Sequence, residues 1–517
     1  MIIAFTMKPN KSLPALVRAK DILSGLASLL LGLLPSSLQA AQSVTLAWNA
    51  VNGVAGYRLH YGTASGTYTQ TVDVGDITTA TVSRLTPGLT YYFAVTAYNV
   101  AGLESLPSNQ VSFLATADAA APAHPVISAI QRVANGAVQL TVTDSFGQTD
   151  SVYASSDLHS WTLLTTAVNR TGTLTVNDPG AAGMNQRFYR AKDATVSTDP
   201  VGFVTLPVAG ASGGEARAFS YLGISLLNPV RYQGTITSFT SYAMTDRNAS
   251  WTADEFNGAN GDFFLEIISG PYAGLMTDIL ATAVPGNTLR TADDLSSLLA
   301  AGELYSIRKH RTLGDVFGES NENGLNGGAT VSEGDEVRVL DAATQTFSTY
   351  YFKTGGFGGI GWRAATDAVA DASGTILYPD QGLLIVRKAA DDINLILTGT
   401  VKTGPTVVPV DRNINLVANI YPAGPLTIAT SGLYVGNDSL GLAGGETIST
   451  ADEVRIFDGS IFQNLFYKTG GFGGTGWRSS TDAVTDASQM PIPPGSSIYV
   501  IRKNGRAAFA WQIPQPY

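Results

Sequence analysis

The chain has 517 residues, a length that corresponds to about three to four domains. It contains no Cys and only four His, which excludes disulfide scaffolds, cysteine-ligated metals and thiol nucleophiles and leaves few residues for imidazole chemistry. The net charge of −10 argues against nucleic acid or an anionic membrane surface as a partner.

Residues 1–40 have the pattern of a secretory signal peptide. Four basic residues precede a largely apolar run at 22–34, and small residues follow it up to Ala40 and Ala41. A run of this length is too short to cross a bilayer core of about 30 Å, and no other stretch is long and apolar enough. We therefore expect an exported chain, secreted or at the cell surface, with no transmembrane segment after cleavage.

Residues 43–117 show the period-two alternation and frequent turn residues of a small β-sandwich. The residues that mark it are Trp48, Tyr57, the segment Leu85-Thr86-Pro87-Gly88-Leu89-Thr90-Tyr91, and Val95. This pattern resembles a fibronectin type III domain. The resemblance implies a core Trp, a Tyr whose hydroxyl caps the backbone at a corner, and structural rather than catalytic roles for these residues.

A second sandwich is predicted after a linker. Residues 118–124 are small and end in a Pro-containing stretch, which is typical of an exposed linker. Residues 125–196 again contain short apolar strands, and their final Phe188-Tyr189-Arg190 strand is similar to that of small sandwich modules in bacterial surface proteins.

The C-terminal half contains an internal repeat. Residues 353–373 and 468–488 share 17 identities in 21 positions, including the motif Gly-Gly-Phe-Gly-Gly-x-Gly-Trp-Arg. The matching strands 384–388 and 499–503 close the two copies, and residues 305–309 provide a third, degenerate version of that strand. We predict a β-rich region in two parts, 199–402 and 403–517, whose copies complete one another's cores.

This region is similar to an uncharacterised family of exported bacterial β-repeat proteins. It shares their Asn-Leu-Val-Ala-Asn-Ile-Tyr-Pro stretch at 415–422, the Gly-Gly-x-Gly-Trp-Arg motif and the closing Arg-Lys strand. The resemblance implies a fold class and no activity. The predicted fold is thus all-β, with one exception at residues 293–301, where the pattern indicates a helix.

The residues considered for ligand binding are Trp362, Arg363, Trp477 and Arg478. Each Trp could stack on a sugar while the adjacent Arg donates to hydroxyl groups, and the alternative is that the rings pack in the core. The glycines before them fit the dinucleotide fingerprint, but no helix follows to face a pyrophosphate, so we interpret them as strand bends.

Repeated acids suggest a second kind of site. Asp335-Glu336 recurs as Asp452-Glu453, and Asp367 and Asp371 recur as Asp482 and Asp486. Such carboxylates could bind Ca²⁺ or hydrolyse glycosides, while repetition favours turn capping and exposed charge. No catalytic constellation is found and no cofactor is expected, with Ca²⁺ the one ion left open.

We expect a non-enzymatic, exported adhesion or binding protein with an extracellular protein or a polysaccharide as its partner. A polysaccharide-active enzyme with a fibronectin-like accessory domain is the alternative from a different class. A structural envelope component is a third.

Overall fold

The computed structural model describes residues 2–5, 42–85, 89–115, 124–145, 147–256, 262–283 and 286–517. Across these residues the regular secondary structure is almost entirely β-strand, with one short α-helix, α1 (Leu313–Phe317), and one 3₁₀ turn (Pro179–Ala181). The all-β prediction is confirmed. No helix in this part of the chain is long and apolar enough to cross a membrane. The predicted signal peptide lies outside the described residues except for 2–5.

The described residues form two compact units. The first comprises the described parts of 1–154, 161–183 and 189–198, and the second comprises 155–160, 184–188 and the described parts of 199–517. We describe each unit by itself.

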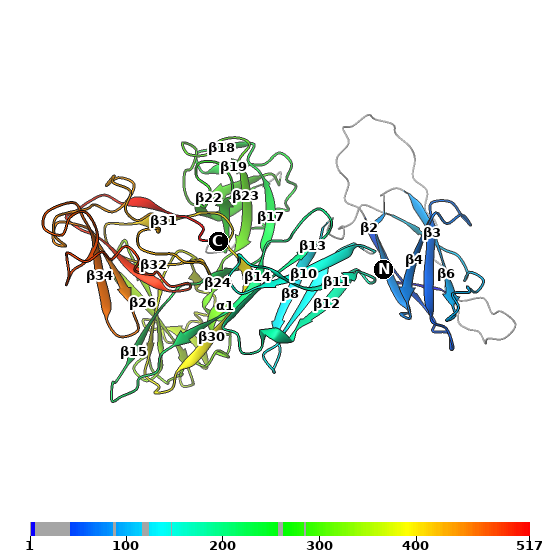
Figure 1. Ribbon diagram of the computed structural model, residues 1–517, viewed down its shortest axis with the longest axis horizontal. Coiled ribbons are helices and arrows are strands. Elements are labelled where there is room, and N and C mark those ends of the chain that lie inside the picture. The colour runs from blue at the N-terminus through cyan, green and yellow to red at the C-terminus, as the bar shows by residue number, and fades with distance from the viewer. Residues whose placement is uncertain are drawn as a thin grey trace. The chain divides into compact units, whose positions relative to one another are not determined.

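The first sandwich lies at the start of the first unit (blue in Figure 1). One sheet has the order β1-β2-β5 and the other β4-β3-β6-β7. Their strands are β1 (Ile2–Phe5), β2 (Gln42–Trp48), β3 (Gly56–Gly62), β4 (Gln70–Gly75), β5 (Thr79–Leu85), β6 (Thr90–Tyr98) and β7 (Val111–Leu114). Trp48, Tyr57, Leu85 and Val95 are buried in one apolar cluster, as the sequence predicted. The corner segment 86–88 lies outside the described residues.

The second sandwich follows the linker, most of which is outside the described residues. One sheet has the order β12-β9-β8, and in the other β10 lies between β11 and β13. The strands are β8 (Val126–Arg132), β9 (Val138–Thr143), β10 (Thr149–Ser155), β11 (Thr162–Val168), β12 (Thr173–Asp178) and β13 (Gln186–Lys192). The alternating burial of β9 places Val138, Leu140 and Val142 in the core, as expected for a strand with one solvated face.

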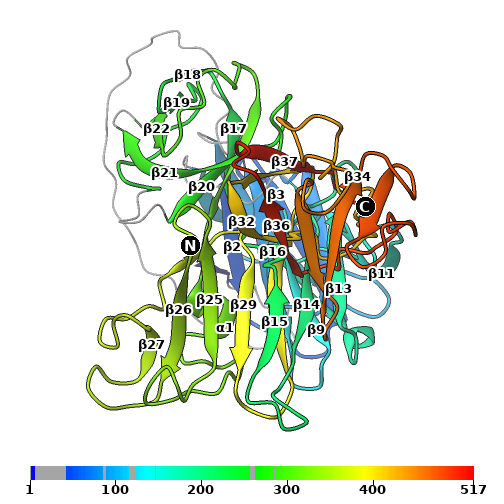
Figure 2. The same ribbon diagram turned by 90° about the vertical axis from the view of Figure 1, so that its left-hand side faces the viewer.

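Three sheets of the second unit share the order of their first five strands, and the third sheet has two more. The sheet β15-β29-β25-β26-β27 belongs to the first copy, β32-β36-β33-β34-β35 to the second, and β17-β23-β20-β21-β22-β19-β18 contains the degenerate closing strand. Figure 2 shows the five strands of the first copy side by side. In each sheet the closing strand (β29, β36 or β23) lies second in the order, so the weak similarity at 305–309 reflects a shared topology.

The strands of these sheets have the following bounds: β15 (Ala218–Leu222), β17 (Val230–Thr235), β18 (Ser238–Thr240), β19 (Ala243–Thr245), β20 (Phe263–Ile267), β21 (Met276–Ala283), β22 (Thr288–Thr291), β23 (Leu304–Lys309), β25 (Glu336–Asp341), β26 (Thr346–Lys353), β27 (Gly361–Ala364), β29 (Leu383–Arg387), β32 (Asn413–Ala418), β33 (Glu453–Phe457), β34 (Phe462–Lys468), β35 (Gly476–Ser479) and β36 (Ser497–Arg502). The remaining strands are β14 (Val201–Val208), β16 (Leu226–Leu227), β24 (Arg311–Thr312), β28 (Ile376–Leu377), β30 (Ile393–Val401), β31 (Thr406–Val410) and β37 (Phe509–Ile513).

Three further strand pairs lie within the copies. β14 pairs with β30 and β24 with β28 in the first part, and β31 pairs with β37 in the second. In the β24–β28 pair Arg311 lies opposite Leu377, so the antiparallel register brings the residue before Arg311 near the residue after Leu377. This pairing positions the candidate site described below.

The prediction of a helix at 293–301 is wrong. The segment forms turns, because Asp294 accepts hydrogen bonds from the backbone and hydroxyl of Ser296 and Gly302 follows at a φ of 96°. The apolar spacing that suggested a helix serves instead to bury Leu295 and Leu299. The described helix α1 begins at Leu313, and Thr312 before it forms a capping box with Asp315.

Candidate functional site

The repeated Trp residues are part of the core. The side chain of Trp362 is fully buried, and its Nε1 donates to the carbonyl oxygen of Gly318 at 2.8 Å. Its ring packs against Phe317 and Phe352, with centroids 5.8 and 5.5 Å away. Trp477 is 4% exposed. Neither ring presents a face on which a sugar could stack, so the stacking role considered from the sequence does not agree with this packing.

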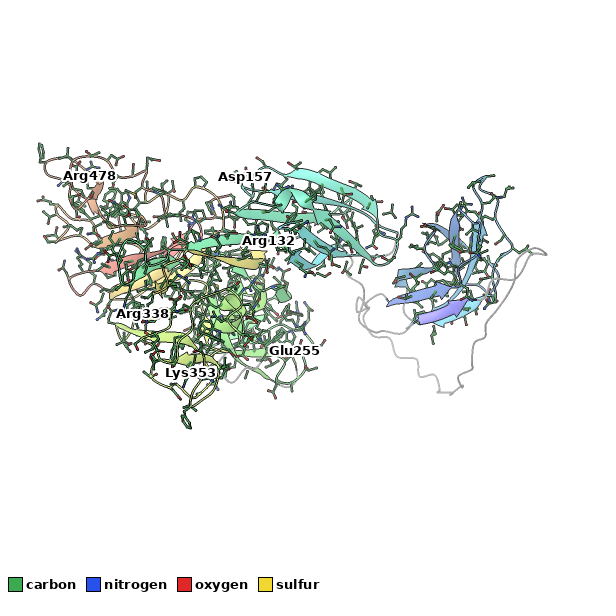
Figure 3. The ribbon with its side chains drawn as sticks, turned by 90° about the horizontal axis from the view of Figure 1, so that it is seen from below. Arg132, Asp157, Glu255, Arg338, Lys353 and Arg478 are labelled. Atoms are coloured by element: carbon green, nitrogen blue, oxygen red, sulfur yellow. The ribbon has the colours of Figure 1, made fainter. Side chains whose placement is uncertain are left out.

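The adjacent Arg residues hold the glycine loop together. Arg363 donates to the carbonyl oxygens of Gly358 and of Trp362, at 2.5 and 2.6 Å, and Arg478 makes the corresponding contacts in the second copy. Lys353 donates to two further carbonyl oxygens beneath the same loop. Lys353 lies in the first copy and Arg478 in the second (Figure 3). The side chains of Arg363 and Arg478 are both buried, and their guanidinium groups hold the loop in this way.

The exposed aromatic residue of the motif is the Phe. Phe357 and Phe472 are 86% and 88% exposed, although they stand only five residues before the buried Trp residues. The loop glycines adopt positive φ angles, which turn the chain outward at this point.

The repeated acids are bound by protein donors. Asp335 is buried and accepts from Arg387 and from the backbone N–H groups of Asn326 and Lys388. Asp452 is held in the same way by Arg502. These carboxylates therefore anchor the closing strand of each copy.

The second pair of repeated acids caps turns. Asp367 accepts from two backbone N–H groups, those of Val369 and Ala370, and this hydrogen bonding lowers its pKa. Asp371 lies 3.5 Å from Arg363 and accepts from Ser373. Among the described residues, no group of three or more His, Asp or Glu is arranged to hold a metal ion.

A different site emerges in the second unit, in a cavity of about 540 Å³. Its wall combines apolar residues with ionisable and hydroxyl-bearing ones. The ionisable and phenolic residues that line it are Asp278, Asp293, Asp294, His310, Tyr378 and Asp380. No local motif in the sequence marks this set, and none of its residues was predicted as a site.

Three strand pairings bring the central residues together. Asp278 of β21 lies opposite Phe264 of β20, and β20 also pairs with β23. His310 follows β23 and Tyr378 follows β28, and the β24–β28 pairing brings these two residues together. The His310 ring lies 4.7 Å from that of Phe264 and 4.9 Å from that of Tyr378.

Asp278 is the centre of the hydrogen-bond network. Its Oδ1 lies 2.9 Å from His310 Nε2, and its Oδ2 accepts from the Tyr378 hydroxyl at 2.9 Å. The side chain of His310 is only 3% exposed, whereas that of Asp278 is 21% exposed. The network therefore fixes a carboxylate that solvent or a ligand can still reach.

Asp380 is the second carboxylate of this site. Burial raises its pKa, and the negative charge of Asp278 acts in the same direction, while His310 opposes them. Burial and the neighbouring Asp278 likewise raise the pKa of Tyr378. Asp380 thus holds a proton more readily than an exposed Asp does.

The site extends into a second cavity of about 300 Å³. Tyr378, Asp380 and Pro409 line both cavities. The neighbouring cavity adds Asp341 and Asp411. The two cavities together offer room for a ligand longer than a single small ring.

One sequence signal could have directed attention to His310. It directly follows the degenerate closing strand, at a position where the other copies carry Ala389 and Asn504. A titratable residue that replaces a neutral one in a repeat is unusual. Its partner Asp278, however, is 32 residues away on another strand, so no spacing rule connects them.

Comparisons with known proteins match mainly a limited part of the chain. The family model of the fibronectin type III domain matches residues 35–113. Among curated proteins, the chain is 37% identical over 163 residues to chitinase A1 of Niallia circulans and 33% identical over 186 residues to endoglucanase B of Cellulomonas fimi. A Kelch domain-containing protein of Saccharolobus solfataricus is 39% identical over 90 residues.

These alignments cover 30%, 34% and 17% of this chain and 22%, 18% and 12% of those proteins, respectively. Among solved structures, a two-domain fibronectin type III segment of chicken tenascin matches with 14% identity and a TM-score of 0.14, covering 32% of this chain and 93% of that one. The sandwich of β2 to β7 and its buried Trp48 agree with the family match. The N-terminal domain of this chain is therefore a fibronectin type III domain.

Proposed function

We propose that this chain is an exported, non-enzymatic binding protein that holds a glycan in the cavity around Asp278, His310, Tyr378 and Asp380. The observation that carries the proposal is the network on Asp278, whose carboxylate is fixed by His310 and Tyr378 while remaining partly exposed. A cavity with apolar walls and a few oriented polar groups is typical of ligand sites. Sugars offer apolar C–H faces and hydroxyl donors that suit such a wall.

Extracellular location is part of the same proposal. The N-terminal pattern of basic and apolar residues favours export, and the chain contains no Cys that would need a reducing compartment. Partial similarity to a chitinase and an endoglucanase supports a polysaccharide as partner. The fibronectin type III domain is compatible with a spacer in such a protein.

The test is an equilibrium titration of the full chain with a panel of soluble oligosaccharides. We expect saturable binding of at least one oligosaccharide that Asp278→Asn weakens, because the amide cannot accept from both His310 and Tyr378 and still offer a charged oxygen to the ligand. Asp371→Asn, which removes an exposed charge elsewhere, should bind as the unmodified chain does. Absence of binding to every member of the panel would contradict the proposal.

A second candidate function is glycoside hydrolysis. It is favoured by the two carboxyl groups in one cavity, because a raised pKa suits Asp380 to a general acid while Asp278 is held in place by His310 and Tyr378. Release of reducing ends from a glycan panel that disappears in Asp380→Asn would establish this function. Binding without any product would favour the non-enzymatic one.

A further inference from the structure

The polar groups of this cavity are strongly biased toward hydrogen-bond acceptors and negative charge. Asp278, Asp293, Asp294 and Asp380 all line it. Among the lining residues that the structure describes there is neither Lys nor Arg. A ligand that enters this cavity therefore meets several carboxyl groups and, among the described lining residues, no Lys or Arg side chain.

The hydroxyl donors of the cavity are already used within the protein. The Tyr378 hydroxyl donates to Asp278, and the Thr277 hydroxyl donates to Asp293 Oδ2 at 2.8 Å. These two groups are thus engaged with the carboxylates of the wall and do not have their protons free for a ligand.

His310 adds a buried polar atom without a partner. An ionised carboxylate only accepts, so in the contact with Asp278 the donor is His310 Nε2. The other ring nitrogen, Nδ1, is buried and has no hydrogen-bond partner among the described residues. A buried polar atom left unpaired is costly, and a polar group brought by a ligand would relieve that cost.

We propose that the cavity selects a protonated amine on a sugar ring, that is, an amino-sugar unit of a cationic glycan. This inference rests on the proposed function, since it names the class of glycan that the site takes. An ammonium group supplies three donors and a positive charge, which matches a wall of carboxylates better than a neutral hydroxyl does. The rings of Phe264 and Tyr378 and the apolar residues around them suit the C–H face of the same sugar.

The experiment compares three oligosaccharides of equal length on the full chain: oligomers of glucosamine, of N-acetylglucosamine and of glucose. Titrations at about pH 5.5 keep the amine protonated, since amines lose their proton well above that pH. We expect the glucosamine oligomer to bind at least about tenfold more tightly than either neutral oligomer, as a charge-assisted hydrogen bond requires. Oligolysine of the same charge should bind more weakly, because it lacks the sugar face.

Variants locate the effect. Asp278→Asn should abolish most of the preference for the amine, and Asp380→Asn should reduce it by less, because the raised pKa of Asp380 leaves that carboxyl less ionised. Asp371→Asn, which also removes one carboxyl group, should leave the preference unchanged. Unfolding midpoints of the variants show whether they are folded, and the comparison of the three oligomers on the unmodified chain needs no variant.

Each outcome bears on a different claim. Equal binding of the three oligomers would overturn the amine preference and leave the proposed glycan function in place. Tighter binding of oligolysine would overturn the sugar part of the inference. A preference that survives in both cavity variants would assign it to another surface, and no binding at all would contradict the inference and the proposed function together.

Discussion

Arg387 and Asp335 form a buried ion pair, with Arg387 Nη1 3.0 Å from Asp335 Oδ2 and both side chains at most 3% exposed. Arg502 and Asp452 repeat the pair at 2.6 Å in the second copy. Each pair joins the closing strand of its sheet to the segment that precedes β25 or β33. The two copies of the repeat thus share a buried Arg–Asp ion pair that joins segments distant in the sequence.

Breaking this pair should destabilise the second unit strongly. Arg387→Met leaves the Asp335 carboxylate buried without its cation, and such a loss typically costs about 3–5 kcal/mol in the free energy of unfolding. Asp371→Asn is the control, because it breaks an ion pair whose acid is 63% exposed and should cost less than about 1 kcal/mol. Urea denaturation of the two variants measures the difference. Equal destabilisation would contradict the structural role of the buried pair.

Substituting the Trp of the repeated motif should destabilise the protein far more than substituting the Phe. Trp362→Ala removes a fully buried ring and should lower the free energy of unfolding by about 3–5 kcal/mol. Phe357→Ala removes an exposed ring and should change it by less than about 0.5 kcal/mol. Thermal unfolding followed by circular dichroism compares the two. A larger effect at Phe357 than at Trp362 would mean that the loop is packed differently.

Two neighbouring glycines of the same loop provide a matched pair. Gly358 has a φ of 92°, and a Cβ at this position would lie 2.5 Å from the carbonyl oxygen of Ala368, so Gly358→Ala should cost more than about 1 kcal/mol. Gly355 has no left-handed φ, and a Cβ added there would meet no atom within 4 Å, so Gly355→Ala should be neutral or slightly stabilising. Chemical denaturation curves measure the stability of both variants. A larger loss of stability in Gly355→Ala than in Gly358→Ala would contradict this prediction.

The second sandwich should lose stability as the pH rises from about 4 to 7. Burial, together with the neighbouring carboxyl groups of Asp144 and Asp193, raises the pKa of Asp150 from 3.8 to about 7. The folded state then binds a proton that the unfolded chain has lost, so the contribution of Asp150 to stability is full below pH 3.8 and is lost as the pH rises through about 7.

Asp150→Asn removes that titration and should flatten this part of the pH profile. Unfolding midpoints measured between about pH 4 and 8 for the chain and the variant provide the test. A profile of the unmodified chain that rises over this range and is unaffected by the substitution would contradict the assignment.

The sequence was sufficient for the fold class and for the first domain. Strand periodicity and turn residues predict β-structure wherever one face is buried, and Trp48 and Tyr57 stand at positions that mark the fibronectin type III sandwich. The repeat predicted a shared architecture, and the three sheets that share the order of their first five strands agree with it. The burial of Trp362 could not be predicted from strand periodicity. Its strand, β27, lies at the edge of the sheet, and Phe317 of α1 packs against the Trp362 ring. No sequence pattern predicted that helix.

The candidate site could not be predicted from local pattern. Asp278, His310 and Tyr378 come from three segments separated by 32 and 68 residues, and they meet through the pairings of β20 with β21, of β20 with β23 and of β24 with β28. Pairing between distant strands depends on the whole sheet and leaves no spacing signature. The helix expected at 293–301 failed for a related reason, since its apolar residues serve a turn packed on the same sheet.

The most direct test of the central claim is a crystal structure of the full chain with a bound glucosamine oligomer. We predict that an amine of the oligomer lies within hydrogen-bond distance, about 2.7–3.2 Å, of a carboxylate oxygen of Asp278 or Asp380. An oligomer bound on the fibronectin type III domain, or a cavity that stays empty at saturating oligomer, would contradict it.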